Sequence, residues 1–167
     1  MEYRTNSEVK LRDVTEEDLP IFFEQQLDST ANYIVAFTAK DPSDRDAFMN
    51  HWTKIKANET ITIKTIIFNG NVTGHISNFE QFGEPEVSYW IGKEYWGQGI
   101  ATKALSEFLN YIKIRPLFAR AAKDNIASIR VLEKCGFRIT SEDKGFSNAR
   151  GMDVEEFILK LEQFDVN

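Results

Sequence analysis

Two short segments of the chain carry residues suited to binding a phosphorylated ligand. The first is E-V-S-Y-W-I-G-K-E-Y-W-G-Q-G-I-A-T-K-A, over residues 86–104. An apolar strand pattern ends at Ile91, and two glycines then flank Gln98 before a helical pattern begins. Gly97 and Gly99 allow successive backbone N–H groups to point at one spot, and the first turn of the helix adds unpaired N–H groups and its positive dipole end. This spacing predicts a turn that holds a pyrophosphate.

The glycine pair alone is also typical of an ordinary turn before a helix. It lacks the third glycine and the acidic residue about 20 positions further on that a dinucleotide site has, and no G-K-[ST] is present. A nucleotide-binding regulator therefore has no support in the sequence. The second segment, N-I-A-S-I-R-V-L-E-K-C-G-F over residues 125–137, narrows the choice of ligand.

Together the two segments resemble the pyrophosphate turn and the N-x-A-S…G-F segment of the GNAT acetyltransferase superfamily. They occur in the same order, with a helix and a strand between them, so the resemblance covers nearly the whole chain. The string that begins at residue 86 is most similar to the branch with the ribosomal-protein alanine N-acetyltransferases and the spermidine acetyltransferases. The resemblance implies an enzyme that moves the acetyl group of acetyl-CoA to a primary amine by direct attack in a ternary complex, with no metal.

The acceptor is less defined than the donor. A protein N-terminal α-amine, as in the ribosomal-protein enzymes, is the first expectation, and a polyamine, an antibiotic or another small amine is the alternative. A non-catalytic acyl-CoA-binding module is an alternative of a different class. It would keep the phosphate turn and lack the acid and the base.

The resemblance also assigns cofactor contacts. Backbone N–H groups from Gln98 to Thr102 would hold the pyrophosphate, and the fourth and fifth strands would separate after Ile91 to admit the pantetheine arm. Asn125 would bond that arm, cap the last helix, or do both. The expected cofactor-binding set is Trp90, Ile91, Trp96, Gly97, Gln98, Gly99, Ile100, Ala101, Thr102, Asn125 and Ser128.

The reaction needs an acid for the departing thiolate and a base for the attacking amine. Ser128, near the start of the last helix, is the expected acid. Glu86 is the expected base, because it precedes the strand separation and alternates with Ser88 and Trp90 on one strand face. Other interpretations stay open: Ser128 as a neutral first-turn serine, Glu86 as an ordinary strand-end carboxylate, and Glu84, His75 or a water chain in place of Glu86.

The chain departs from the common family pattern at two positions. Trp96 stands where many members have Arg or Gln, which the resembling branch tolerates. Leu132 stands where many members have a tyrosine that acts as general acid, so another residue must act as the acid or the reaction must proceed without one. Lys123, Arg130 and Lys134 are candidates for the 3′-phosphate, with solvated lysines as the alternative. Cys135 follows a helix, where the dipole disfavours a thiolate, so we interpret it as a packing residue.

Composition fits one domain over residues 1–167, with 1–7 loosely ordered. The single cysteine excludes an internal disulfide and a thiolate metal cluster, and suits a reducing cytoplasm. Residues 93–137 hold eight Lys or Arg and four Asp or Glu, a net charge of +4. Since the whole chain has a net charge of −6, the remaining residues together carry −10. The overall charge argues against nucleic acid, and no apolar run approaches the ~20 residues of a membrane span. A homodimer is compatible with the sequence.

Periodicity predicts an α/β fold in the broad sense, that is, a mixed α+β arrangement. It would have about seven mostly antiparallel strands in one mixed sheet, flanked by about four helices. Thr15 should cap a first helix, and Pro42-Ser43 should open a second, with residues 31–40 irregular between them. The expected strands are 9–12, 60–68, 72–79, 86–91, 116–122, 137–146 and 152–161. The last two expected helices follow the glycine turn and span 125–135, the latter ended by Gly136.

Overall fold

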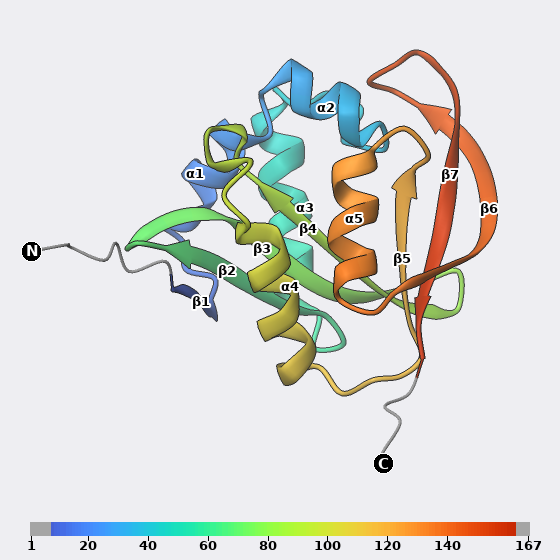
Figure 1. The fold of residues 1–167 in the computed structure, drawn as a ribbon. Coiled ribbons are helices and arrows are strands. Elements are labelled where there is room, and N and C mark those ends of the chain that lie inside the picture. Colours follow the sequence, from blue (N-terminus) through green and yellow to red (C-terminus); the bar gives the residue numbers. More distant parts are fainter. Residues whose placement is uncertain (1–7, 163–167) are drawn as a thin grey trace, which may run out of the picture.

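The computed structural model of the chain describes residues 8–162, so the expected loose order of residues 1–7 lies outside the described part. Three helices follow the first strand, three strands come next, and a short 3-10 turn, η1, precedes the fourth helix (Figure 1). In order they are β1 (Val9–Asp13), α1 (Asp18–Gln25), α2 (Ser29–Val35), α3 (Arg45–Ala57), β2 (Thr62–Phe68), β3 (Asn71–Gln81), β4 (Glu84–Ile91), η1 (Lys93–Tyr95), α4 (Ile100–Tyr111), β5 (Leu117–Ala122), α5 (Ile126–Lys134), β6 (Arg138–Ser147) and β7 (Met152–Leu161).

The described strands form one 7-stranded sheet in the order β1-β2-β3-β4-β5-β7-β6. Neighbouring strands run antiparallel except β4 and β5, which are parallel. This confirms the predicted mixed sheet. The parallel pair follows from α4, because a crossover long enough to return the chain in the same direction needs an intervening helix.

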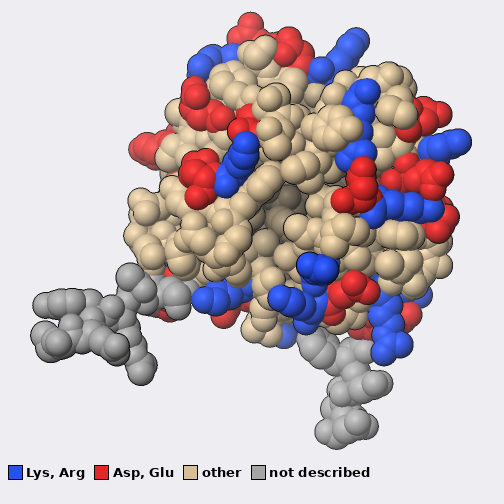
Figure 2. All heavy atoms as spheres, turned by 45° about the horizontal axis from the view of Figure 1, so that its top comes forward, with Lys and Arg blue, Asp and Glu red and all other residues tan. Residues whose placement is uncertain are grey.

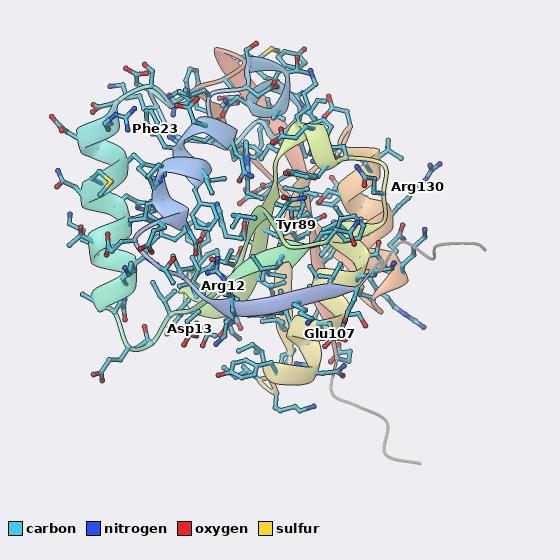
Figure 3. All side chains as sticks on the ribbon, turned by 90° about the vertical axis from the view of Figure 1, so that its left-hand side faces the viewer. Arg12, Asp13, Phe23, Tyr89, Glu107 and Arg130 are labelled. Carbon is cyan, nitrogen blue, oxygen red and sulfur yellow. The ribbon has the colours of Figure 1, made fainter. Side chains whose placement is uncertain are left out.

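Helices cover both faces of the sheet (Figure 1). One face carries α4 and α5, and its core joins buried sheet residues such as Ile76 to Leu105 and Phe108 of α4. The other face carries α1 and α3, which enclose an aromatic cluster around Phe22 and Trp52. Figure 3 shows Phe23 between α1 and α3. The sheet thus separates two hydrophobic cores, one on each face. An opening between two of its strands would connect the two faces.

Two tight hairpins align β2, β3 and β4. Asn69 and Gly70 both have positive φ (51° and 80°), which is the twist-matched two-residue turn that Asn-Gly predicts. The second turn uses Phe82 and Gly83, with φ of 54° and 78°. Strand β4 begins before the expected position 86 and includes Pro85. The paired register from Gly74 to Gln81 is unbroken, so the direction of every β4 side chain is fixed.

The first helices depart from the prediction. Residues 31–35, part of the 31–40 segment expected to be irregular, belong to α2, so the described part has five α-helices rather than about four. Its sequence, S-T-A-N-Y-I-V, is short and rich in residues of low helix propensity, and Asp28 starts it by accepting a 2.8 Å bond from the Ala31 N–H. Thr15 does not cap α1, which begins at Asp18; the Asp18 carboxylate instead accepts from the Thr15 N–H at 2.9 Å.

The later elements follow the prediction. The helix after the glycine turn, α4, and the last helix, α5, both form, and Gly136 follows α5 with φ of 98°. The hairpin of β6 and β7 places β7 beside β5 and β6 at the sheet edge. The loop between β6 and β7 therefore ends close to α2 and the start of α5 (Figure 1).

Candidate functional site

The parallel strands β4 and β5 meet at a single register position. Glu86 faces Phe118 there, while the rest of β4 pairs only with β3 and the rest of β5 only with β7. The strands then diverge, and we call the separation between their unpaired backbone edges the slit. The predicted separation exists, but it begins at Glu86 rather than after Ile91.

One backbone edge of β4 faces this slit. The Gly92 N–H donates to the Thr73 carbonyl of β3 at 2.8 Å. Because backbone groups alternate between the two edges of a strand, those of Trp90 also face β3, and those of Tyr89 and Ile91 face the slit. A ligand with amide groups can pair with such an edge as an added strand does. This geometry favours Tyr89 and Ile91 for backbone pairing, where the sequence suggests Trp90 and Ile91.

The glycine turn leads directly into α4 above the slit. Gly97 and Gly99 both have positive φ, 79° and 75°, and Gly99 is the N-cap of α4. No side chain caps this helix and its first turn holds no acidic residue. The N–H groups of residues 100–102 have no partner within the helix, so an anion can take the place of a cap. The residues present therefore fit a pyrophosphate.

Trp96 links this turn to the end of β4. Its indole N–H donates to the Ile91 carbonyl at 2.8 Å. The carbonyl is one of those that face the slit, so the indole occupies the upper end of the free β4 edge. Position 96, where Arg or Gln is common in the family that the sequence resembles, here has a structural role in fixing the turn against the strand.

The start of α5 borders the slit on the same face of the sheet. Asn125 caps α5, accepting from the Ser128 N–H at 3.3 Å, and its amide N–H groups stay available. The Ser128 hydroxyl lies 2.9 Å from the hydroxyl of Tyr89 on β4. Figure 3 shows Tyr89 toward the middle of the molecule. Burial raises the pKa of Tyr89 to about 12, so this phenol keeps its proton at neutral pH.

Glu86 lies at the vertex of the slit, with its side chain on the opposite face of the sheet. It is 4% exposed and 3.4 Å from the Nε atom of Arg120. The shorter contacts of Arg120 are with Glu156 at 2.7 Å and Asp143 at 3.0 Å. Burial raises the pKa of Glu86 above its ordinary value although Arg120 opposes the shift. A carboxylate held loosely by a shared cation, with a raised pKa, is suited to accept a proton.

The other candidate bases fit less well. His75 packs between the rings of Phe22 and Trp52, with centroids at 4.8 and 5.0 Å, and the loss of solvation there lowers its pKa to about 4. It belongs to the aromatic core. Glu84 is exposed at the first residue of β4, beyond the vertex of the slit.

The basic candidates for the 3′-phosphate differ from one another. Lys123 already pairs with Glu155 at 2.6 Å and Glu142 at 2.9 Å. Arg130 and Lys134 are exposed on α5, and Figure 3 shows Arg130 at the outer surface of the molecule. These two remain the better placed candidates.

Two further positions on α5 follow from packing. Leu132 is 2% exposed within the main core, so it offers the slit no acidic group. Cys135 ends α5 with its sulfur 3.7 Å from the Thr102 carbonyl, and burial raises the pKa of its thiol. Both observations agree with a packing role.

A bridge closes the end of the slit between α2 and the β6–β7 loop. The Arg150 side chain donates to the carbonyls of Tyr33 at 2.8 Å and Ile34 at 3.3 Å, in the last turn of α2. The same guanidinium binds Asp124, which precedes Asn125. An arginine that satisfies the free carbonyls of a helix end holds that helix in place. No local sequence pattern predicts this bridge, because its members are far apart in the chain.

Figure 2 shows the molecular surface hollowed near the centre of its view, with largely uncharged atoms inside and Lys, Arg, Asp and Glu side chains around it. In residues 8–162 no group of three or more His, Cys, Asp or Glu is placed to hold a metal ion. Within the same range, none of the helices has the length and apolar character needed to cross a membrane.

The model of the acetyltransferase (GNAT) domain family matches residues 8–138. The chain belongs to the GNAT family. YdaF of Bacillus subtilis strain 168, described provisionally as a ribosomal N-acetyltransferase, is 30% identical to this GNAT chain over 112 residues. That match covers 60% of this chain and 61% of YdaF, and a match to p20 of Bacillus licheniformis covers 49% of this chain and 48% of p20.

Solved structures agree with the GNAT fold. A ribosomal-protein-alanine N-acetyltransferase from Brucella melitensis has a TM-score of 0.75 at 20% identity, covering 92% of this chain and 99% of that one. A spermidine N-acetyltransferase from Vibrio cholerae, solved with CoA and spermine, has a TM-score of 0.74 at 19% identity, covering 93% of this chain and 96% of that one. At these identities the likeness concerns the fold.

Proposed function

We propose that this GNAT domain is an N-acetyltransferase that takes acetyl-CoA as donor and the N-terminal α-amine of a protein as acceptor. One observation carries the proposal: Ser128 and Glu86 lie on opposite faces of the sheet, beside the slit between β4 and β5. A donor can enter from the α4 and α5 face and an amine from the other face. Membership of the GNAT family and the named relatives support the reaction class.

The residues at the slit can perform each part of a direct transfer. The free N–H groups at the start of α4 would bind the pyrophosphate, and the slit-facing edge of β4 would pair with the pantetheine amides. The backbone N–H of Tyr89 is aimed into the slit, where it can donate to the oxygen of a tetrahedral intermediate. Glu86 would take a proton from the attacking amine, and Ser128 would give one to the departing sulfur.

The charge near Glu86 bears on the acceptor. Arg120 is surrounded by Glu86, Glu156 and Asp143, so this face of the slit has an excess of carboxylate. That surplus suits a cationic amine. The resemblance of the chain to the ribosomal-protein branch, and the name of YdaF, favour a protein N-terminus; the fold shared with a spermidine enzyme keeps a polyamine as the alternative.

Thiol release from acetyl-CoA, measured against N-terminal peptides, polyamines and aminoglycosides, tests the proposal. We expect turnover with the peptides and roughly 10²-fold or greater loss in Glu86→Gln and Ser128→Ala, the usual size of a lost acid or base. Glu84→Gln, an exposed carboxylate on the same strand, is the matched control and should keep full activity. Because burial raises the pKa of Glu86, wild-type kcat/KM should fall as pH drops through a value above 4.5, and Glu86→Gln should lack that limb.

The outcomes separate the candidate functions. Turnover with polyamines alone would replace the acceptor and keep the reaction. Full turnover in both variants would remove the acid and base roles. Silence across the panel, with acetyl-CoA still raising the melting temperature, would favour the non-catalytic acyl-CoA-binding module.

A further inference from the structure

Tyr89 joins the two walls of the slit. Its side chain reaches from β4 to α5, where its hydroxyl lies 2.9 Å from the Ser128 hydroxyl. Within residues 8–162, neither hydroxyl makes another hydrogen bond. The Tyr89 ring is partly buried and packs against the main core, and this packing holds its hydroxyl toward α5.

The chemistry of the pair sets the direction of the bond. A phenol is a better donor and a poorer acceptor than an aliphatic hydroxyl, and burial raises the pKa of Tyr89 further, so its proton stays in place. Tyr89 therefore donates to Ser128. Because this bond occupies one lone pair of the Ser128 oxygen, rotation of the Ser128 hydroxyl is restricted. Its own proton must point away from Tyr89.

The remaining directions are limited by the helix. The Ser128 N–H is held by the Asn125 side chain, so the backbone of this residue is fixed at the start of α5. Ser128 is half-buried, and the open side of its hydroxyl adjoins the slit, because Tyr89 itself belongs to the part of β4 that has separated from β5. The Ser128 proton is thus available to an atom in the slit.

We infer that Tyr89 is a positioning residue, which orients the Ser128 hydroxyl as a donor to the sulfur of CoA. The inference rests on the proposed function. When the tetrahedral intermediate collapses to the amide, the C–S bond breaks with its electron pair on sulfur, and the sulfur takes the Ser128 proton. The Ser128 oxygen then takes a proton from solvent, which receives in exchange the proton that Glu86 removed from the amine. Tyr89 keeps its own proton throughout and stabilises the transient negative charge on the Ser128 oxygen.

The test is a binding measurement on the full chain with CoA and desulfo-CoA, which differ only at the sulfur. A donor aimed at the sulfur should make wild type prefer CoA, and should lower the pKa of the bound thiol below that of free CoA, so that the preference grows as pH rises. We expect a preference of about tenfold, the usual size of one hydrogen bond to a charged group. Tyr89→Phe, which removes only the hydroxyl, should lose most of it.

Three variants make the result specific. Ser128→Ala should lose the same preference, and the double variant should lose no more than either single one, because the two hydroxyls act as a unit. Tyr95→Phe, which removes a hydroxyl from another tyrosine packed on the same core, should behave as wild type. Melting temperatures check that each variant is folded, and affinity for desulfo-CoA should be unchanged in all of them.

The possible results distinguish this inference from the proposed function. A Tyr89→Phe variant that keeps the preference for CoA, beside a Ser128→Ala variant that loses it, would overturn the role of Tyr89 alone. Equal binding of CoA and desulfo-CoA by wild type would overturn that role together with the role of Ser128. In an enzyme with turnover, Tyr89→Phe should lower kcat by about tenfold without changing KM for acetyl-CoA.

Discussion

Arg150 and Asp124 form a bidentate ion pair, with contacts of 2.7 and 2.8 Å, across the end of the slit. The Arg150 side chain is only 8% exposed and at the same time satisfies carbonyls at the end of α2. One guanidinium therefore joins the end of α2 to the turn that precedes Asn125. This relationship could not be found in the sequence, because it joins residues far apart in the chain.

Replacement of Arg150 should loosen α2 without unfolding the sheet. Charge-assisted bonds of this kind are worth about 1.5–3 kcal/mol each when one partner is lost, so Arg150→Ala should lower stability by about 2 kcal/mol. Amide hydrogen exchange should speed up in residues 29–35, and KM for the amine should rise more than KM for acetyl-CoA. Lys144→Ala, an exposed cation on β6, is the control. Unchanged exchange in α2 would contradict this role of Arg150.

Gly99 should be required for CoA binding because of its backbone conformation. An alanine at φ of 75° costs about 1–2 kcal/mol in the left-handed region, and the local relaxation would turn N–H groups away from the pyrophosphate. We expect Gly99→Ala to weaken CoA binding about tenfold in calorimetric titration. Gly70→Ala is a close match, since φ there is 80° and an added Cβ meets nothing within 4 Å at either position.

The hairpin at Gly70 is remote from the slit, so its variant should lose similar stability and keep its affinity for CoA. An equal loss of affinity in both variants would mean that the glycine turn binds no pyrophosphate.

Asp18 should make folding sensitive to acid. The carboxylate is 2% exposed and receives bonds from Arg12 at 2.7 Å and Thr65 at 2.7 Å. These bonds outweigh the opposing effect of burial and lower its pKa to about 2. Because the folded value lies below the unfolded one of about 3.9, this stabilisation is complete above pH 4 and is lost as pH falls toward 2.

The shift corresponds to about 2 kcal/mol at neutral pH. Urea unfolding at several pH values should therefore show Asp18→Asn less stable by about that amount at pH 7, with a flatter dependence between pH 4 and 2. Glu17→Gln, at an exposed neighbour, serves as the reference. A parallel decline of Asp18→Asn and wild type over this range would assign the acid sensitivity to other groups.

Local patterns were enough to predict the elements from β2 onward. The Asn69-Gly70 turn, the glycines before α4 and Gly136 after α5 each have a conformation that few other residues adopt, so they mark element ends reliably. The first helices were harder, because α2 consists of residues with weak helix propensity and depends on the cap at Asp28 and on tertiary contacts.

The parts of the site that a short sequence motif forms could be predicted. The parts that depend on how the strands pair and align could not. The glycine turn and the Asn125 cap could be read from neighbouring residues. The pairing of Tyr89 with Ser128, the position of Arg120 beside Glu86 and the indole bond of Trp96 depend on which strands adjoin and on how they align. A sequence shows that the Tyr89 and Glu86 side chains point to opposite faces of a strand, but not which helix lies over either face.

The central step is the transfer of an acetyl group across the slit. This transfer can be measured directly with isotope-labelled acetyl-CoA and mass spectrometry of the amine. Wild type should move the label to the N-terminal α-amine of an acceptor peptide, with kcat/KM near the ~10⁴ M⁻¹s⁻¹ of ordinary enzymes. Glu86→Gln should move it at least about 10² times more slowly, while Glu84→Gln matches wild type. Labelled amine formed at the same rate by wild type and Glu86→Gln, or no labelled amine from any acceptor, would contradict the account.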